Sequence, residues 1–273
     1  MTLEAHSVDG QLFQDMRVLA ENMASRRQAL RWLGTGVVAP LALTACGGGG
    51  SSTSSSACSV IPSETNGPYP GDGTNSLNGT LVNALLLSGI VRSDITSSIV
   101  SSSTVATGLP LQVTLNLENS RASCAPLAGY AIYLWHCTQD GLYSMYSTGI
   151  TGENYLRGVQ VADSNGSVTF QTIFPGCYSG RMPHIHFEIY ASETLATSTP
   201  AGDGIKTSQI AFPIATCNAV YATSGYTASV SNLAAMSFAT DNVFSDGYAT
   251  QLATMTGDAS SGYVATLNVG ISV

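Results

Sequence analysis

The sequence predicts an all-β fold, a β-sandwich with long loops and little helix. Turn-forming dipeptides recur at short intervals through residues 58–273, where the chain can reverse between strands. They are Asn66-Gly67, Asn78-Gly79, Asp140-Gly141, Asn165-Gly166 and Pro175-Gly176. Between such turns lie short apolar or alternating runs typical of strands, at residues 111–117, 130–135, 167–172 and 184–190. Only residues 230–238 space their apolar side chains as a helix would.

The composition is typical of a folded extracellular domain. Charged residues make up 10% of the 273 residues, and the mean hydropathy is +0.18. Residues 1–57 carry four basic and four acidic groups, so the net charge of −8 belongs to residues 58–273, with five basic and thirteen acidic groups. A nucleic-acid partner is disfavoured, because phosphate binding needs a basic surface.

The N-terminal segment has the features of an export signal. Arg26 and Arg27 precede an uncharged stretch rich in Val, Leu and Ala at residues 34–45. This stretch is too short to span a bilayer, which takes about 20 apolar residues. It suits the hydrophobic region of a signal peptide, and the paired arginines favour the twin-arginine route.

The apolar stretch ends in Leu43-Thr44-Ala45-Cys46, which resembles the lipobox of bacterial lipoproteins. The alternative is a cysteine that lies near a cleavage site by chance. A Gly/Ser-rich run follows, as a flexible tether would. We therefore expect an export signal at 1–45, a tether at 46–57 and a folded domain at 58–273. The protein would be periplasmic or at the cell surface, touching the membrane only through a lipid on Cys46.

Five further cysteines follow the lipobox, and an oxidising compartment makes disulfides reasonable for them. Because five is odd, at least one thiol stays free. Spacing does not establish the pairing. Two pairs are expected as guesses: Cys58 with Cys124, at the start of the domain, and Cys177 with Cys217, beside the histidines.

The sharpest candidate site is His184-Ile185-His186. On a strand, residues i and i+2 share a face, so the two imidazoles would lie side by side while Ile185 points into the core. Two neutral imidazoles at this spacing are half of a metal site. The alternative is a pair of hydrogen-bonded histidines on a solvated strand face.

Two upstream segments carry further candidate side chains. A glycine-containing loop at residues 174–183 brings Tyr178 and Arg181 next to the histidines in the sequence. The turn after the strand at 130–135 presents Tyr143. Each tyrosine alone would be assigned to packing.

Together, the motifs W-H-x-x-x-D-G-x-Y-S at 135–144, L-R-G-V-Q at 156–160 and F-P-G-x-Y-x-G-R-x-x-H-I-H at 174–186 resemble the intradiol ring-cleavage dioxygenases. The resemblance covers roughly residues 60–250, includes Glu-Thr-Asn-Gly-Pro-Tyr at 64–69, and is strongest to the small exported, protocatechuate-dioxygenase-like members. It implies the family's prealbumin-like β-sandwich. The helical dimerisation segment of long catechol dioxygenases has no counterpart in residues 47–75.

By this resemblance the metal ligands are Tyr143, Tyr178, His184 and His186, with Tyr178 and His186 axial, and the cofactor is Fe(3+). The ligand types suit that ion. A trivalent cation keeps phenols deprotonated at neutral pH, and two phenolates cancel two of its charges. Two histidines with a carboxylate would select ferrous iron instead.

The resemblance also implies roles for neighbouring residues. Arg181 matches an active-site arginine that could stabilise charge on the substrate ring, although a structural carboxylate partner is the alternative. Gln209 matches a glutamine behind the ligands. Arg157 is expected to support the site, and His136 to be structural.

The function implied is the cleavage of a catechol-type diol with O2 to a muconate-type diacid. The acidic domain argues against a strongly acidic substrate. Family members of the compact type often assemble, so a homo-oligomer is compatible with the sequence. Two rival hypotheses are a metal-free, transthyretin-like surface binding module and a cupin-type metal site built on His-x-His.

Overall fold

The computed structural model describes residues 58–198 and 203–273. The expected export signal and tether lie outside the described residues and stay predictions. Two β-sheets and a separate hairpin carry most of the regular structure in the described part. The elements are β1 (Asp72–Leu77), β2 (Thr80–Asn83), β3 (Pro110–Asn119), β4 (Ala125–Pro126), β5 (Ala131–Trp135), β6 (Arg157–Val161), β7 (Ser167–Ile173), β8 (His184–Tyr190), α2 (Glu193–Ser198), β9 (Lys206–Ala211), α3 (Ile214–Tyr221), α4 (Thr227–Ala234), the 3-10 turn η1 (Phe244–Asp246), β10 (Thr254–Asp258) and β11 (Gly262–Ile271).

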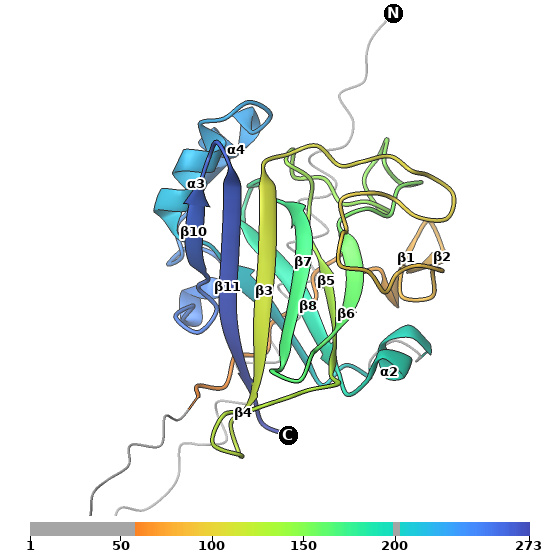
Figure 1. Ribbon diagram of the computed structural model, residues 1–273. Helices are drawn as coiled ribbons and strands as arrows, with labels where there is room; N and C mark the ends of the chain where they lie inside the picture. Colours follow the sequence, from red (N-terminus) through yellow and green to blue (C-terminus); the bar gives the residue numbers. More distant parts are fainter. Residues whose placement is uncertain (1–57, 199–202) are drawn as a thin grey trace, which may run out of the picture. The chain divides into compact units, whose positions relative to one another are not determined.

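The first sheet is built around β3. Strand β11 pairs with β3 in parallel and with β10 in antiparallel orientation, while β4 and β7 pair with different parts of β3. Figure 1 shows β11, β3 and β7 side by side. The second sheet has the antiparallel order β6-β5-β8-β9.

The sandwich core forms where the two sheets face each other. Alternate residues of β3 point inward, and alternate residues of β8 meet them from the second sheet, as a period of two requires. The inward residues of these two strands are Leu111, Val113, Leu115, Leu117, Ile185, Phe187 and Ile189. The prediction that Ile185 enters the core is therefore confirmed, which turns its two histidine neighbours toward the opposite face.

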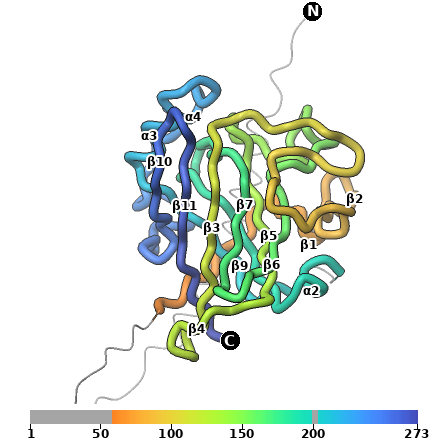
Figure 2. The backbone as a smooth tube through the Cα atoms, in the orientation of Figure 1, coloured from red at the N-terminus to blue at the C-terminus, as the bar shows by residue number. Residues whose placement is uncertain are grey.

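The second sheet is buried on that opposite face as well. All of β5 is buried, and its outward residues Tyr133 and Trp135 belong to a second apolar cluster, under the hairpin β1–β2 and the loops around it. The long connection at 84–109 crosses the edges of both sheets, since Arg92 N–H donates to the Val159 carbonyl at 2.9 Å and Ile95 N–H to the Gln171 carbonyl at 3.0 Å. Figure 2 shows this connection looping beside β1 and β2. The covered face is where the histidines point.

The predicted strands coincide with β3, β5, β7 and β8, with ends that differ by one or two residues. The predicted helix at 230–238 lies a few residues earlier, as α4. Helices α2 and α3 were not predicted, because α2 has only six residues and the apolar side chains of α3 do not gather on one face. No helix in the described ranges is both long and apolar enough to cross a bilayer.

The two expected cysteine pairs have different outcomes. The pairing of Cys177 with Cys217 is wrong: both are buried free thiols, and the Cys177 thiol is turned toward the Arg181 carbonyl at 3.4 Å. Cys58 and Cys124 do lie next to each other, with the Cys58 backbone nitrogen 2.7 Å from the Cys124 sulfur.

Candidate metal centre

Four side chains from three segments converge on the covered face of the second sheet. His184 and His186 come from β8, Tyr178 from the loop before it, and Tyr143 from the turn after β5. The Nε2 atoms of the two histidines lie 3.1 Å apart, and the Tyr178 hydroxyl lies 3.2 Å from His184 Nε2. The Tyr143 ring is 6.0 Å from the Tyr178 ring and 6.4 Å from the His186 ring, between centroids. The structure thus brings all four expected ligands together.

Neighbouring groups fix the orientation of each imidazole. The backbone carbonyl of Met182 lies 2.7 Å from His184 Nδ1, so Nδ1 carries the proton and the Nε2 lone pair points into the site. The His186 ring stacks on Trp135 with centroids 4.9 Å apart and planes at 7°. The loop before β8 thus orients His184, and strand β5 orients His186.

The two tyrosine-bearing loops pack closely against each other. Gly141, in the turn that carries Tyr143, has φ +82° and lies against Tyr178, such that an added Cβ would be 2.9 Å from the Tyr178 Cβ. The turn is closed by the Tyr143 N–H, which donates to the Ser147 hydroxyl at 2.9 Å. Glycine is needed at 141 for both its conformation and its lack of a side chain.

The electrostatics of these groups favour a bound cation. Burial lowers the pKa of His184 well below its usual value, with a smaller contribution from Arg181. Burial, and then the neighbouring His184, does the same to the pKa of His186. Both rings are thus neutral, and one nitrogen of each faces the other across 3.1 Å. A metal ion at this place would take both lone pairs.

The hydroxyl of Tyr143 is the clearest sign of a missing partner. Tyr143 is 2% exposed, and its hydroxyl makes no hydrogen bond to any of the described residues. Burial, followed by the adjacent Tyr178, raises the pKa of this phenol well above its usual value. Buried hydroxyls are normally bonded, so an unsatisfied one at a cluster of metal-ligand types marks a coordination position. Two phenols and two imidazoles fit ferric iron. The positive charge of that ion would lower the pKa of the Tyr143 phenol, which burial alone raises.

Arg181 lies behind the tyrosines and is almost fully buried. Its Nε forms a salt bridge with Asp241 at 3.0 Å, and its second terminal nitrogen donates to Gln209 Oε1 at 2.7 Å. Gln209 pairs with His186 in the β8–β9 register and donates to the Thr65 carbonyl at 3.0 Å. The structural carboxylate raised as the alternative for Arg181 therefore exists, and it holds the guanidinium beside the site.

Known proteins resemble this chain over the segment that carries the four side chains. A family model described as Dioxygenase (Dioxygenase_C) matches residues 106–201, a range that contains the four converging side chains. A solved intradiol ring-cleavage dioxygenase from Tetranychus urticae is 28% identical, with a TM-score of 0.58, and the match covers 79% of this chain and 95% of that one. The matched segment belongs to the dioxygenase family, and the described domain has the fold of an intradiol ring-cleavage dioxygenase.

Curated relatives match a shorter part of the chain. A chlorocatechol 1,2-dioxygenase from Rhodococcus opacus is 33% identical over 88 residues, which are 25% of this chain and 34% of the relative. Another from Pseudomonas putida is 33% identical over 81 residues, 23% of this chain and 31% of that one. The chain spans about a third of the length of these relatives.

Arg157 supports the centre, and its hydrogen bonds go to groups other than the four ligand side chains. Its guanidinium is fully buried and donates to the backbone carbonyls of Tyr69, Pro70 and Ser144 at 2.7–3.0 Å. It thereby joins the turn that carries Tyr143 to the Gly-Pro-Tyr loop. That loop closes over the site, since a Cβ added to Gly67 would lie 3.2 Å from the His186 ring. The expected supporting role of Arg157 agrees with these contacts.

His136 is structural, as expected. Its two ring nitrogens bond to the Cys137 carbonyl at 2.8 Å and to the Thr172 hydroxyl at 2.7 Å, so both already have partners. Asp241 was the residue that sequence reasoning missed. It follows the helical region by several residues and lies outside the segment that the family model matches, so only a contact with Arg181 could reveal it.

Proposed function

We propose that this protein is an exported ferric-iron dioxygenase that cleaves catechol-type aromatic diols in the intradiol manner and releases a muconate-type diacid. The observation that carries the proposal is the convergence of two phenols and two imidazoles, with the buried Tyr143 hydroxyl lacking a hydrogen-bond partner among the described residues. The likeness to dioxygenases over residues 106–201 and to a solved intradiol ring-cleavage dioxygenase supports the same reaction class.

Tyr143, Tyr178, His184 and His186 would hold the iron. Bound Fe(3+) supplies Lewis acidity, which draws electron density from a bound catecholate and makes its ring reactive toward dioxygen. The protein's own residues orient the diol and exclude water: the Gly67 loop covers His186, and Trp135 fixes that imidazole from behind.

Tyr178 and Arg181 have the positions for the proton and charge steps. Tyr178 is only partly buried, whereas the other three ligand residues are buried. Its phenolate oxygen is thus the best placed to accept a proton from an entering diol. Arg181 can stabilise negative charge that develops on the ring, and its own charge is balanced by Asp241.

The substrate class follows from the relatives and the charge. The two curated relatives act on chlorocatechols by name, which supports a catechol without an acidic substituent. The acidic domain also disfavours anionic diols. Oxygen uptake should be measured with catechol, chlorinated catechols, hydroxyquinol and protocatechuate, and we expect protocatechuate to be the poorest of the four.

The decisive experiment is iron binding by the full-length protein. We expect about one iron per chain and a red colour from tyrosinate-to-iron charge transfer, which shifts when catechol is added. Tyr178→Phe should lose turnover and alter the colour while remaining folded. Tyr130→Phe, at a tyrosine packed on the sandwich core, is the matched control and should behave as the wild type. A colourless, iron-free wild-type protein would favour the metal-free binding module instead.

The proposed location has its own test. If Cys46 carries a lipid, cells fed labelled palmitate will label the wild type, and Cys46→Ser will release the protein from the membrane fraction. Replacing Arg26 and Arg27 by lysines should retain it in the cytoplasm. Unlabelled wild-type protein in the soluble fraction would contradict the anchor.

A further inference from the structure

We propose that Cys58 and Cys124 form a disulfide that fastens one end of a strap whose other end covers the metal centre. The strap is residues 58–71. This inference goes beyond the proposed function, and it requires neither iron nor a catechol.

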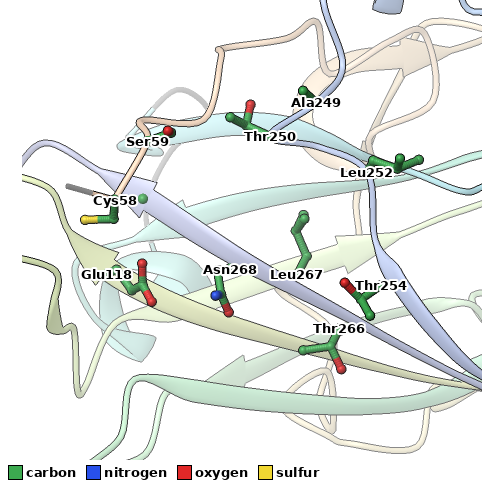
Figure 3. A pocket seen from close by; sticks show the side chains of 11 residues that line it. Cys58, Ser59, Glu118, Ala249, Thr250, Leu252, Thr254, Thr266, Leu267 and Asn268 are labelled. Atoms are coloured by element: carbon green, nitrogen blue, oxygen red, sulfur yellow. The ribbon is translucent and has the colours of Figure 1, made fainter. Parts of the chain in front are cut away.

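The two cysteines meet where the strap begins. Cys124 lies in the turn between β3 and β4, and Cys58 is the first described residue. Their sulfur atoms lie within 4.8 Å of each other and of a Glu118 carboxylate oxygen, and the Cys58 nitrogen is 2.7 Å from the Cys124 sulfur. Figure 3 shows Cys58 and Glu118 at the same end of a groove over β11.

From Cys58 the strap first joins the edge of the first sheet. Val60 forms a parallel bridge with Gly270 of β11, and the Ile61 N–H donates to the Gly270 carbonyl at 2.9 Å. Ile61 is 1% exposed and packs in the sandwich core. These contacts hold the beginning of the strap on the first sheet. The same continuous segment then leads to the histidines of the second sheet.

The strap then crosses to the second sheet and ends on the site. The Glu64 N–H donates to the Thr207 carbonyl of β9 at 2.9 Å, and the Thr65 carbonyl accepts from Gln209 at 3.0 Å. Two residues later, Gly67 lies against His186. Only eight residues therefore lie between Cys58 and the glycine that covers the metal centre.

A covalent bond at residue 58 would protect this short path. Segments at the margin of a fold open more readily than its core, and fraying that began at Cys58 would proceed toward Gly67 and Gln209. A disulfide to Cys124, which lies 66 residues away in the sequence, stops that fraying at its origin. Any force on the residues before Cys58 would also be transmitted through the disulfide to the turn after β3, and not to the loop over His186.

The remaining thiols are poor competitors for this bond. Cys137, Cys177 and Cys217 are almost completely buried, so an external oxidant reaches them poorly. The Cys137 and Cys177 thiols also donate to the carbonyls of Gly176 and Arg181, at 3.5 and 3.4 Å. Cys58 and Cys124 are only partly buried. Bond formation removes one proton from each thiol and two electrons in all. An external disulfide compound accepts them and leaves as a dithiol.

The test counts alkylatable thiols in unreduced, denatured full-length protein. If the pair is bonded, Cys58→Ser and Cys124→Ser each show one thiol more than the wild type, because each frees the partner. The double variant shows the same number as the wild type. Cys217→Ala, which removes an unpaired thiol, is the control and shows one fewer. A double variant with two fewer thiols would overturn the proposal, and so would a stoichiometric zinc ion bound through both cysteines.

The second measurement follows the strap itself by hydrogen exchange. In the double variant we expect the amides of Ile61 and Glu64 to exchange faster than in the wild type, while those of β8 keep their rates, and the melting temperature to fall by about 10 °C. Reduced wild-type protein should match the double variant. Unchanged exchange of both amides would contradict the role of the disulfide in holding the strap, whatever the iron content.

Discussion

Arg181 shows how one buried charge is arranged beside a charged metal centre. Its guanidinium would be repelled by a metal cation and would be costly to bury alone. Asp241 removes most of that cost, because its carboxylate accepts from Arg181 and also from the Met182 backbone N–H at 2.7 Å. The other carboxylate oxygen accepts the N–H groups of Val243 and Phe244. Asp241 thus orders its own loop and the arginine together.

Replacing Asp241 by asparagine should therefore be strongly destabilising. The side-chain volume is kept, but the buried charge of Arg181 loses its partner, and we expect the free energy of unfolding to fall by about 3–5 kcal/mol. Urea denaturation measures this. Adding Arg181→Met to Asp241→Asn should restore part of the loss. The exposed Asp203→Asn is the control, with an effect within about 0.5 kcal/mol. A similarly small effect of Asp241→Asn would contradict this account.

His136 predicts a pH dependence of stability. Burial lowers its pKa to about 4, whereas an unfolded histidine titrates near 6.5. Between these two pH values the unfolded chain binds the proton more readily than the folded protein does. The contribution of His136 to stability is therefore complete above about pH 6.5 and is lost as the pH falls toward 4. The contribution is about 3 kcal/mol.

The measurement compares urea midpoints of the wild type and His136→Gln between pH 7 and pH 4. The other histidines titrate in both proteins, so the difference between the two curves isolates His136. We expect the wild type to lose more stability on acidification than the variant. Parallel curves would show that His136 does not titrate in this range.

At the scale of elements, β8 and two loops build the centre. The strand alternation places both imidazoles on one face without any help from the rest of the chain. The tyrosines depend on contacts between loops: the turn at Gly141 packs on Tyr178, and Arg157 ties the Tyr143 turn to the Gly67 loop. The geometry of the phenols is thus set by loop packing, and it should respond to small changes there.

Gly141→Ala tests that dependence, with Gly129→Ala as its matched control. Both glycines have φ near +80°, so each alanine should cost about 1–2 kcal/mol in unfolding free energy. At 141 the new Cβ would also lie 2.9 Å from the Tyr178 Cβ, whereas at 129 nothing lies within 4 Å. We expect Gly141→Ala alone to weaken the charge-transfer band and the iron content. Identical spectra of the two variants would contradict the contact's importance.

At the scale of the whole described domain, the first sheet joins strands that lie far apart in the sequence. The C-terminal strand β11 lies between β10 and β3, with β3 about 150 residues earlier in the chain. Val269 and Ile271 of β11 are almost completely buried. The sandwich, and with it the support for the strap, is thus complete only when the last strand is in place.

Deleting residues 268–273 should therefore prevent stable folding. The deletion exposes the edge of β3 near Asn119 and removes Val269 and Ile271 from the core. We expect insoluble protein, or a urea midpoint too low to measure. Deleting only residues 272 and 273, which follow β11, should leave a folded protein with a modestly lower midpoint. Normal solubility and stability of the longer deletion would contradict this architecture.

Local patterns were sufficient to predict the strands that carry the site. The His-x-His spacing, the inward position of Ile185 and the strands at 111–117 and 167–172 follow from a period of two, which needs no knowledge of distant residues. The two tyrosines were selected by the order of motifs around them. The types of ligand, and through them the preference for ferric iron, were likewise readable from residue identity.

Only the tertiary structure decided which distant groups meet. Asp241 pairs with Arg181 across 60 residues, Cys124 lies at Cys58 across 66, and Thr65 contacts Gln209 across 144. The sequence by itself determined the face on which each histidine lies, because side-chain direction along a strand is a local property. Charge pairing, cysteine pairing and the cover over the metal centre depend on how the sheets and loops pack, and local periodicity does not encode those long-range contacts.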